Sequence, residues 1–326
     1  MALARWVGVA VVLAAVGGTL WVSRAADRAA RLAEETWPPV GAFVETAQGQ
    51  VHYLQRGDGP DVVLLHGASG NLRDYSFDLM DKLVQRGFRV TAFDRPGLGY
   101  TDRAAPGLNK AFTGRAESPA EQARMLAEAA ETLGIRRPVV VGHSFGGSVA
   151  MAWALDHDAA AVVSLAGAVM PWPGELGLYH RVFGSVLGSA LLAPLAVALV
   201  DPMKTGSTVA GIFAPQAMPD GYLDHVGPGL TLRTPVMRAN VRQINTLKPH
   251  VTAMARRYPS LEIPVEFLHG SEDTTVPLVT HSEPASRLLP NAALTVLEGV
   301  GHMPQHARPG AALEAIERAA RRAGLR

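Results

Sequence analysis

Residues 138–147 read Pro-Val-Val-Val-Gly-His-Ser-Phe-Gly-Gly, and this stretch predicts the fold. Pro138–Gly142 is a short apolar run, typical of a strand that is buried on both faces, and a helical pattern follows over Gly146–His157. Between them stands Gly-x-Ser-x-Gly, which in a strand–turn–helix context holds a serine on a sharp turn. We therefore interpret Ser144 as a nucleophile at the N-terminus of a helix, where developing negative charge is favoured.

The alternation of strands and helices continues on both sides of this turn. Eight strands are predicted, at 42–46, 50–55, 61–66, 89–93, 138–142, 160–165, 265–269 and 293–297, the first two as a hairpin. Helices are predicted at 74–86, 119–133, 146–157, 281–289 and 309–323, with a capping box formed by Ser118 and Glu121. This order favours a doubly wound, mostly parallel eight-stranded α/β sheet.

Residues from about 170 to 258 break the alternation, and they are too many for a plain loop. We interpret them as a mainly helical cap inserted between the sixth and seventh strands. The predicted organisation is therefore an N-terminal segment over residues 1–40, followed by a single domain over 41–326 that contains this insertion.

A serine hydroxyl needs a neighbouring base, and two later loops supply one together with an acid. Asp273 lies in the loop directly after the strand at 265–269, and His302 lies in a glycine-bracketed loop after the last strand. Both loops follow the carboxyl ends of strands, where open α/β sheets place their sites. We interpret His302 as the base and Asp273 as the acid that orients it, with Glu272 as the alternative acid.

Backbone amides are expected to stabilise an oxyanion at the same edge of the sheet. The loop His66–Asn71 follows the first parallel strand. The predicted donors are the N–H groups of Ala68, in this loop, and of Phe145, the residue after the nucleophile. We interpret His66 as a structural residue that braces the loop, and not as a second base.

Four motifs together resemble the α/β-hydrolase superfamily. They are His66-Gly67, the segment Asp94–Thr101 (Asp-Arg-Pro-Gly-Leu-Gly-Tyr-Thr), Gly142–Gly147, and the loops that carry Asp273 and His302. The resemblance covers about residues 42–323, and it implies the same three catalytic residues, a cap over the site and a structural role for Asp94. Epoxide hydrolases and haloalkane dehalogenases carry Asp where this chain has Ser144, so the resemblance is to esterase-like serine hydrolases with a cap.

Composition excludes several classes of protein. The 326 residues include 30 Lys and Arg against 29 Asp and Glu, and the net charge of +1 argues against nucleic-acid binding. There is no cysteine, which excludes disulfides, thiolate metal sites and a cysteine nucleophile. We predict no metal and no cofactor.

The N-terminus carries a run of 17 uncharged residues, Trp6–Val22. As a helix this run is roughly 26 Å long, which is the short end of spanning length. We predict a single-pass membrane anchor followed by a charged helix and linker, with a cleaved signal peptide or a buried helix as alternatives. The short basic start favours export of the catalytic domain, whereas Arg24, Arg28 and Arg31 after the run favour the opposite orientation.

These features predict a serine hydrolase that forms an acyl-enzyme and acts on a small, fairly apolar carboxylic ester. The apolar substrate is inferred from Val182–Val200, 19 residues without a charge inside the predicted cap, which we interpret as lining a pocket; a lipid-facing entrance is an alternative. A carbon–carbon bond hydrolase or cofactor-free perhydrolase of the same fold is the alternative function. A non-catalytic binding member of the fold is a second alternative.

Overall fold

One eight-stranded sheet organises the chain. The structure, a computed structural model, describes residues 2–326, without the side chains of residues 2–4, 8–12 and 203. The strands are β1 (Ala42–Thr46), β2 (Gly49–Arg56), β3 (Asp61–Leu65), β4 (Arg89–Phe93), β5 (Val139–His143), β6 (Ala161–Leu165), β7 (Val265–Gly270) and β8 (Ala292–Leu297). Each of the eight predicted strands is present within one residue of its predicted ends.

The strand order is β1-β2-β4-β3-β5-β6-β7-β8. β1 and β2 form the predicted hairpin, and β2 also runs antiparallel to β4, while the remaining pairs are parallel. The central strands β5 and β6 are buried along their whole length, as expected for parallel strands that are covered on both faces. The predicted doubly wound sheet is therefore confirmed.

Helices cover both faces of this sheet. They are α2 (Arg73–Ser76), α3 (Leu79–Gln85), α4 (Pro119–Thr132), α5 (Phe145–Asp156), α12 (Ser282–Leu288), α13 (Pro304–Ala307) and α14 (Pro309–Arg322). The capping box of α4 is confirmed, because Ser118 Oγ accepts from the Glu121 amide and the Glu121 carboxylate accepts from the Ser118 amide. The prediction of a single helix over residues 74–86 is wrong, because Asp78 takes a non-helical conformation (φ −154°, ψ −54°) and separates α2 from α3.

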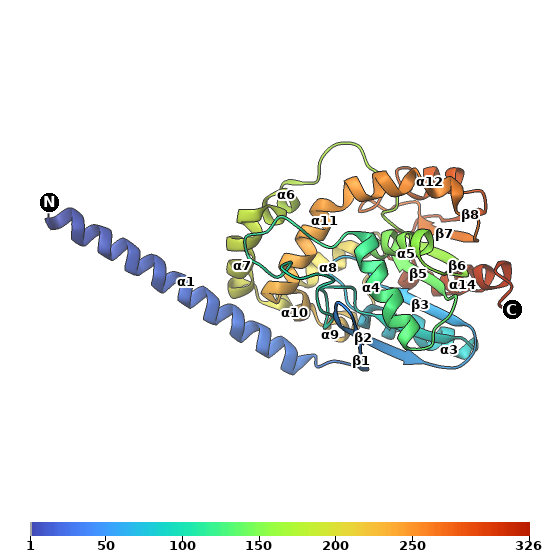
Figure 1. Cartoon of the computed structure of the whole chain (residues 1–326), viewed down its shortest axis with the longest axis horizontal. Coiled ribbons are helices and arrows are strands. Elements are labelled where there is room, and N and C mark those ends of the chain that lie inside the picture. Colours follow the sequence, from blue (N-terminus) through green and yellow to red (C-terminus); the bar gives the residue numbers. More distant parts are fainter. Residues whose placement is uncertain (1) are drawn as a thin grey trace.

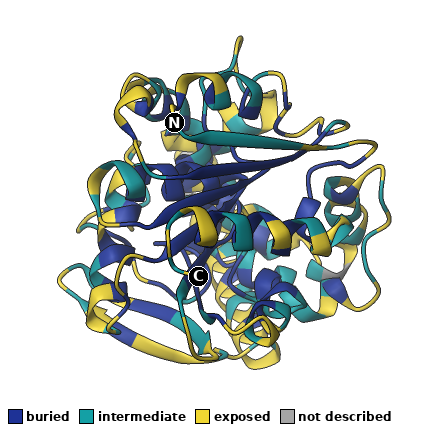
Figure 2. Cartoon of the chain, turned by 90° about the vertical axis from the view of Figure 1, so that its right-hand side faces the viewer, coloured by how far each residue is buried: buried dark blue, intermediate teal, exposed yellow. Residues whose placement is uncertain are grey.

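Two apolar cores result, one on each face of the sheet. Helices α4 and α5 contribute to the first, around the fully buried Trp153, and α3 and α14 contribute to the second. Figure 2 shows the strands as a buried layer between helices that are exposed on their outer sides. Glu266 of β7 is buried and forms ion pairs with Arg318 and Arg322 of α14. These ion pairs link α14 to the sheet in addition to the apolar contacts.

The chain between β6 and β7, which we call the cap segment (residues 166–264), is mainly helical. It contains α6 (Leu178–Gly184), η1 (Gly188–Leu192), α7 (Ala193–Leu199), η2 (Pro202–Thr205), α8 (Gly206–Phe213), α9 (Tyr222–Val226), α10 (Pro228–Thr231), α11 (Thr234–Ala255) and η3 (Tyr258–Ser260). Polar contacts join it to loops of the sheet: the Asn240 side chain accepts from the Ser69 amide at 2.7 Å, and the Tyr222 hydroxyl donates to Asp74 at 2.6 Å.

Helix α1 (Ala2–Thr36) precedes the sheet and packs against the cap segment. Figure 1 shows its N-terminal part projecting away from the rest of the chain, while its later part lies beside α7. Ala26 lies in a small apolar cluster with Ala193 and Val197 of α7, and Glu34 pairs with Arg233 at 2.8 Å. Residues 23–36 are therefore part of a packed helix.

The predicted membrane anchor lies on this helix. Among the residues that the structure describes, no single helix has both the length and the apolar character needed to span a membrane. The predicted span Trp6–Val22 includes residues 8–12, whose side chains lie outside the described residues. One pair of consecutive helices, Leu178–Gly184 and Gly188–Leu199, meets the length and composition requirement when the two helices are taken together, but the chain bends by 84° between them.

Trp37 follows the last residue of α1 and holds this end of the helix against the cap segment. The Trp37→Ala substitution tests this contact. Its Nε1 donates to the Asp224 carbonyl at 2.7 Å, its own carbonyl accepts from the Tyr100 hydroxyl at 2.6 Å, and its ring lies against Gly227 and Gly229. Trp37→Ala is expected to lower the free energy of unfolding by about 1–3 kcal/mol and to expose residues 24–40 to trypsin. Trp21→Ala, which removes an exposed ring from the same helix, should change neither measurement.

Candidate active site

Ser144 stands at the turn between β5 and α5, as the Gly-x-Ser-x-Gly motif predicts. Its backbone is strained, with φ 52° and ψ −119°, a left-handed conformation that non-glycine residues seldom adopt. Two hydrogen bonds to the neighbouring strand and loop hold it there: the Ser144 amide donates to the Leu165 carbonyl, and the Ser144 carbonyl accepts from the Ala168 amide, each at 3.0 Å. The turn therefore fixes the serine at the carboxyl end of the sheet.

The glycines on either side of the serine are required by close backbone contacts. A Cβ atom on Gly142 would overlap the carbonyl of Gly146, and one on Gly146 would overlap the carbonyl of Leu65. The absence of a side chain at Gly142 and Gly146 allows α5 to begin directly against the end of β3. The loop after β3 is thereby brought next to Ser144, and a Cβ on Gly67 would lie 3.1 Å from the Ser144 Cβ.

Asp273 and His302 form a buried pair. His302 Nδ1 lies 2.7 Å from Asp273 Oδ2, and the other oxygen of this carboxylate accepts from the amides of Thr275 and Val276 at 2.9 and 2.8 Å. A carboxylate cannot donate, so Nδ1 carries the proton and Nε2 is left free to act as a base. Glu272, the alternative acid, is exposed to solvent.

His269 is a second imidazole on the same carboxylate, and the sequence analysis did not assign it a role. Its Nε2 lies 3.1 Å from Asp273 Oδ2 and 2.7 Å from the Val276 carbonyl, and its Nδ1 lies 2.7 Å from the Ser282 hydroxyl. Burial would raise the pKa of Asp273, but the hydrogen bonds from His269 and then from His302 outweigh it and hold the pKa below its ordinary value. The carboxylate is therefore ionised at neutral pH.

The serine and the base are held in neighbouring positions but are not hydrogen bonded to each other. Within the described part of the chain, the Ser144 hydroxyl makes no hydrogen bond. The residue before it, His143, donates from Nε2 to the His302 carbonyl at 2.9 Å, and the two rings are 4.9 Å apart. Hydrogen bonds between catalytic groups often shorten only when substrate binds.

The two predicted oxyanion donors also lie at this edge. Ala68 is in the loop after β3, which Gly67 brings against Ser144, and Phe145 is the first residue of α5. Neither amide has an acceptor among the residues that the structure describes. Helix α5 adds the positive end of its dipole at the same place.

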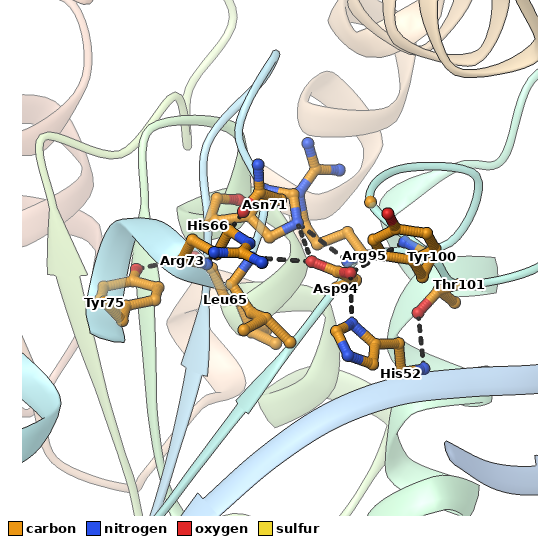
Figure 3. Close-up of polar contacts among 12 residues, drawn as sticks. His52, Leu65, His66, Asn71, Arg73, Tyr75, Asp94, Arg95, Tyr100 and Thr101 are labelled. Carbon is orange, nitrogen blue, oxygen red and sulfur yellow. Dashed lines mark hydrogen bonds and ion pairs between the residues drawn. The ribbon is translucent and has the colours of Figure 1, made fainter. Parts of the chain in front are cut away.

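His66 and Asp94, which the sequence analysis interprets as structural residues, are hydrogen bonded within the protein. The Arg95 amide donates to His66 Nε2 at 2.9 Å, so His66 must donate from Nδ1 to the Gly67 carbonyl; burial lowers the pKa of His66 to about 4. Figure 3 shows Asp94 beside the His52 ring, and Asp94 Oδ2 lies 2.7 Å from His52 Nδ1. The Asp94 carboxylate also accepts from the amides of Leu72 and Tyr100. Asp94 therefore shapes the turn that follows β4.

His302 and His306 have the four-residue spacing seen in helical metal-ligand pairs. In the structure they bond to different carboxylates: His302 to Asp273, and His306 Nε2 to Asp74 at 2.8 Å. Among the residues described, no group of three or more His, Asp or Glu is arranged to hold a metal ion.

Three buried histidines make the stability of the protein depend on pH. Burial is the main cause that lowers the pKa of each of His66, His143 and His281 to about 4, whereas an unfolded chain binds these protons near pH 6.5. The unfolded state therefore takes up more protons between pH 6.5 and 4, so the free energy of unfolding should fall as pH is lowered through this window.

Urea unfolding between pH 7.5 and 5 measures this effect. If all three imidazoles contribute, the slope reaches about 4 kcal/mol per pH unit, and it should be shallower by about a third in His281→Asn, which keeps an acceptor for the Met170 amide. A free energy of unfolding that stays constant from pH 7 to pH 5 would contradict the neutral, buried state of these rings.

Comparison with known proteins agrees with this architecture. A protein of Mycobacterium tuberculosis without an assigned function is 30% identical over 278 residues, which are 80% of this chain and 75% of that protein. An esterase from Exiguobacterium antarcticum matches with a TM-score of 0.66 at 16% identity, over 86% of this chain and 98% of the esterase. A membrane phospholipase A matches with a TM-score of 0.66 at 19% identity, over 98% of both chains.

These two structural matches show the fold alone, because their sequence identities are low. The model of the alpha/beta hydrolase fold family matches residues 60–309. The chain therefore belongs to the alpha/beta hydrolase family.

Proposed function

We propose that this protein is a serine hydrolase that cleaves carboxylic esters through an acyl-enzyme. The observation that carries the proposal is the meeting of three features at one edge of the sheet. They are the strained Ser144 turn, the buried Asp273–His302 pair and the amides of Ala68 and Phe145, which have no acceptor in the described part of the chain. Together they supply a nucleophile, an oriented base and donors for a developing oxyanion.

In the proposed mechanism His302 Nε2 removes the Ser144 proton as Oγ attacks the ester carbonyl. The carbonyl oxygen becomes negative and is stabilised by the two amides, while Asp273 stabilises the imidazolium through Nδ1. His302 then gives the proton to the leaving alcohol, and the acyl group stays on Ser144. A water molecule, deprotonated by the same ring, releases the acid and restores the serine.

The substrate is proposed to be small and fairly apolar. The support for this proposal is the uncharged run Val182–Val200 inside the cap segment. A hollow of 530 Å³ on the surface of the cap segment is lined by residues between Leu178 and Leu192, and none of the proposed catalytic residues lines it. A carbon–carbon bond hydrolase would use the same three catalytic residues. Turnover of p-nitrophenyl esters of increasing chain length, compared with an amide and a diketone substrate, separates these activities.

The role of Ser144 is tested with a fluorophosphonate probe. We expect stoichiometric labelling of the wild-type protein and none of Ser144→Ala, because only an activated serine reacts. A folded wild-type protein that is not labelled would contradict the enzymatic proposal and favour a binding role for the fold.

His302→Ala is expected to lower kcat for esters by about 10⁴-fold or more without unfolding the protein. The reason is that its Nε2 serves proton transfer, while the backbone contact with His143 remains. His157→Ala, a change at the far end of α5, is the matched control and should keep full activity. Near-normal turnover by His302→Ala would remove this residue from the mechanism.

We also propose that the protein works against a lipid surface. The outer side of α6, η1 and α7 exposes a run of large apolar side chains, Leu178, Tyr179, Val182, Val186, Leu187, Leu191, Leu195, Leu199 and Val200. Helix α1, which packs on α7, also exposes Trp6, Leu13, Val16, Leu20 and Trp21. Contiguous exposed apolar surface of this kind is typical of membrane or protein contacts.

Flotation with phosphatidylcholine–phosphatidylglycerol vesicles tests this proposal. Deletion of residues 1–24 should weaken vesicle binding and spare turnover of soluble esters, because the catalytic residues and Trp37 remain. Adding Leu187→Ser and Leu191→Ser to the deletion should abolish binding. Full flotation of this last variant, or no flotation of the wild-type protein, would contradict the lipid contact.

A further inference from the structure

Arg95 is a fully buried cation beside the proposed catalytic site, and the mechanism above gives it no role. It belongs to the turn after β4, and its side chain has no exposure to solvent. Every polar group of the guanidinium has a partner: Nε donates to the His66 carbonyl at 2.7 Å, Nη2 to the Gly67 carbonyl at 3.1 Å, and Nη1 to the side chains of Gln122 and Gln243. Figure 3 shows Arg95 beside His66 and Asp94.

The contact with Gly67 acts on the first oxyanion donor. The Gly67 carbonyl and the Ala68 N–H belong to one peptide group, so they point in opposite directions. Three donors fix that carbonyl: Arg95 Nη2, His66 Nδ1 at 2.9 Å and the Gly70 amide at 3.4 Å. Fixing the oxygen also fixes the direction of the N–H, and a positive charge at the oxygen end polarises the peptide and strengthens the N–H as a donor.

The guanidinium also contacts the residue that carries the second donor. Its carbon lies 4.4 Å from the centre of the Phe145 ring, a cation–π distance. Phe145 is buried and begins α5 directly after Ser144. One cation therefore contacts both the Gly67–Ala68 peptide, which carries the first proposed donor, and the ring of Phe145, which carries the second, although these two sites lie more than seventy positions apart in the sequence.

We propose that Arg95 is a positioning residue for the oxyanion hole. Its guanidinium orients the Gly67–Ala68 peptide and holds the Phe145 ring in place relative to this peptide. It also places a buried positive charge on the side of the donors that faces away from the oxyanion. The inference rests on the proposed ester hydrolysis. It adds that the donors depend on a side chain that never touches the substrate.

Arginine is suited to this task, and lysine is not. A guanidinium offers five donors in a fixed plane, so it can bridge two carbonyls and two amide side chains while its face lies on a ring. A lysine would keep the charge but could not make these contacts together. Loss of one oxyanion donor typically costs about 10²- to 10³-fold in kcat, so disordering one or both donors should cost a measurable part of that factor.

Arg103 provides a matched control. It is also a buried arginine, in the same polar cluster, and it pairs with Glu117 through both Nε and Nη2 and donates to the Leu108 carbonyl. Among the described residues, its hydrogen bonds, ion pairs and ring contacts include none with the loop His66–Ala68 or with Phe145. Arg103→Lys changes a second buried guanidinium, and its pairing with Glu117, while the groups that contact Gly67 and Phe145 stay as they are.

The experiment compares Arg95→Lys and Arg103→Lys in the full-length protein. For a p-nitrophenyl ester, we expect Arg95→Lys to lower kcat by about 10- to 100-fold with KM changed less than about threefold. Affinity for an alkylboronic acid, which forms a negatively charged tetrahedral adduct with Ser144, should weaken by the same factor as kcat/KM. Arg103→Lys should lose thermal stability and keep kcat within about threefold.

Two outcomes overturn the inference while leaving ester hydrolysis in place. One is unchanged kcat and boronate affinity in folded Arg95→Lys, and the other is an equal loss of kcat in both arginine variants, which would indicate a purely structural cluster. If Arg95→Lys does not fold, the double variant Gln122→Met with Gln243→Met decides, because it removes both acceptors of Arg95 Nη1 and keeps the charge; unchanged kcat there also overturns the inference. A wild-type protein that shows no ester turnover and no fluorophosphonate labelling overturns the proposed function itself.

Discussion

The site depends on one close contact, that of the Gly146 backbone with the carbonyl of Leu65. Any side chain at position 146 would separate the start of α5 from the end of β3. With that contact in place, the turn at Ser144, the loop after β3 and the N-terminus of α5 converge at one point. The strain of the serine backbone is balanced by the hydrogen bonds that this approach permits, to Leu165 and Ala168.

Around this point the protein buries ionisable groups in defined protonation states. Asp273 stays charged because two imidazoles and two amides donate to it, whereas His143 and His281 stay neutral because burial penalises their charged forms. Arg95 stays buried because carbonyls, amide side chains and a ring surround its guanidinium. The arrangement therefore gives each proton a fixed position before substrate arrives, which is the condition for electrostatic preorganisation.

The cap segment couples the edge of the sheet to the N-terminal helix. Asn240 and Gln243 of α11 contact the loop after β3 and the Arg95 cluster, and Arg233 at the start of the same helix donates to the Gly99 carbonyl and pairs with Glu34 of α1. A continuous set of contacts thus joins α1, the cap segment and the loops that surround Ser144.

Local sequence determined the strands and the Ser144 turn and predicted the proposed acid and base, because these follow from short-range properties: apolar runs, glycines that permit close backbone approach, and loops placed after strands. The break between α2 and α3 was missed because the polar and apolar spacing of residues 74–86 continues across Asp78. The pairing of His269 with Asp273 and the contacts of Arg95 were decided only by the tertiary structure. His269 contacts Asp273 because β7 ends between them and the chain turns back. Arg95 contacts Gly67 and Phe145 because three segments that are distant in the sequence pack together, and no local sequence pattern specifies that packing.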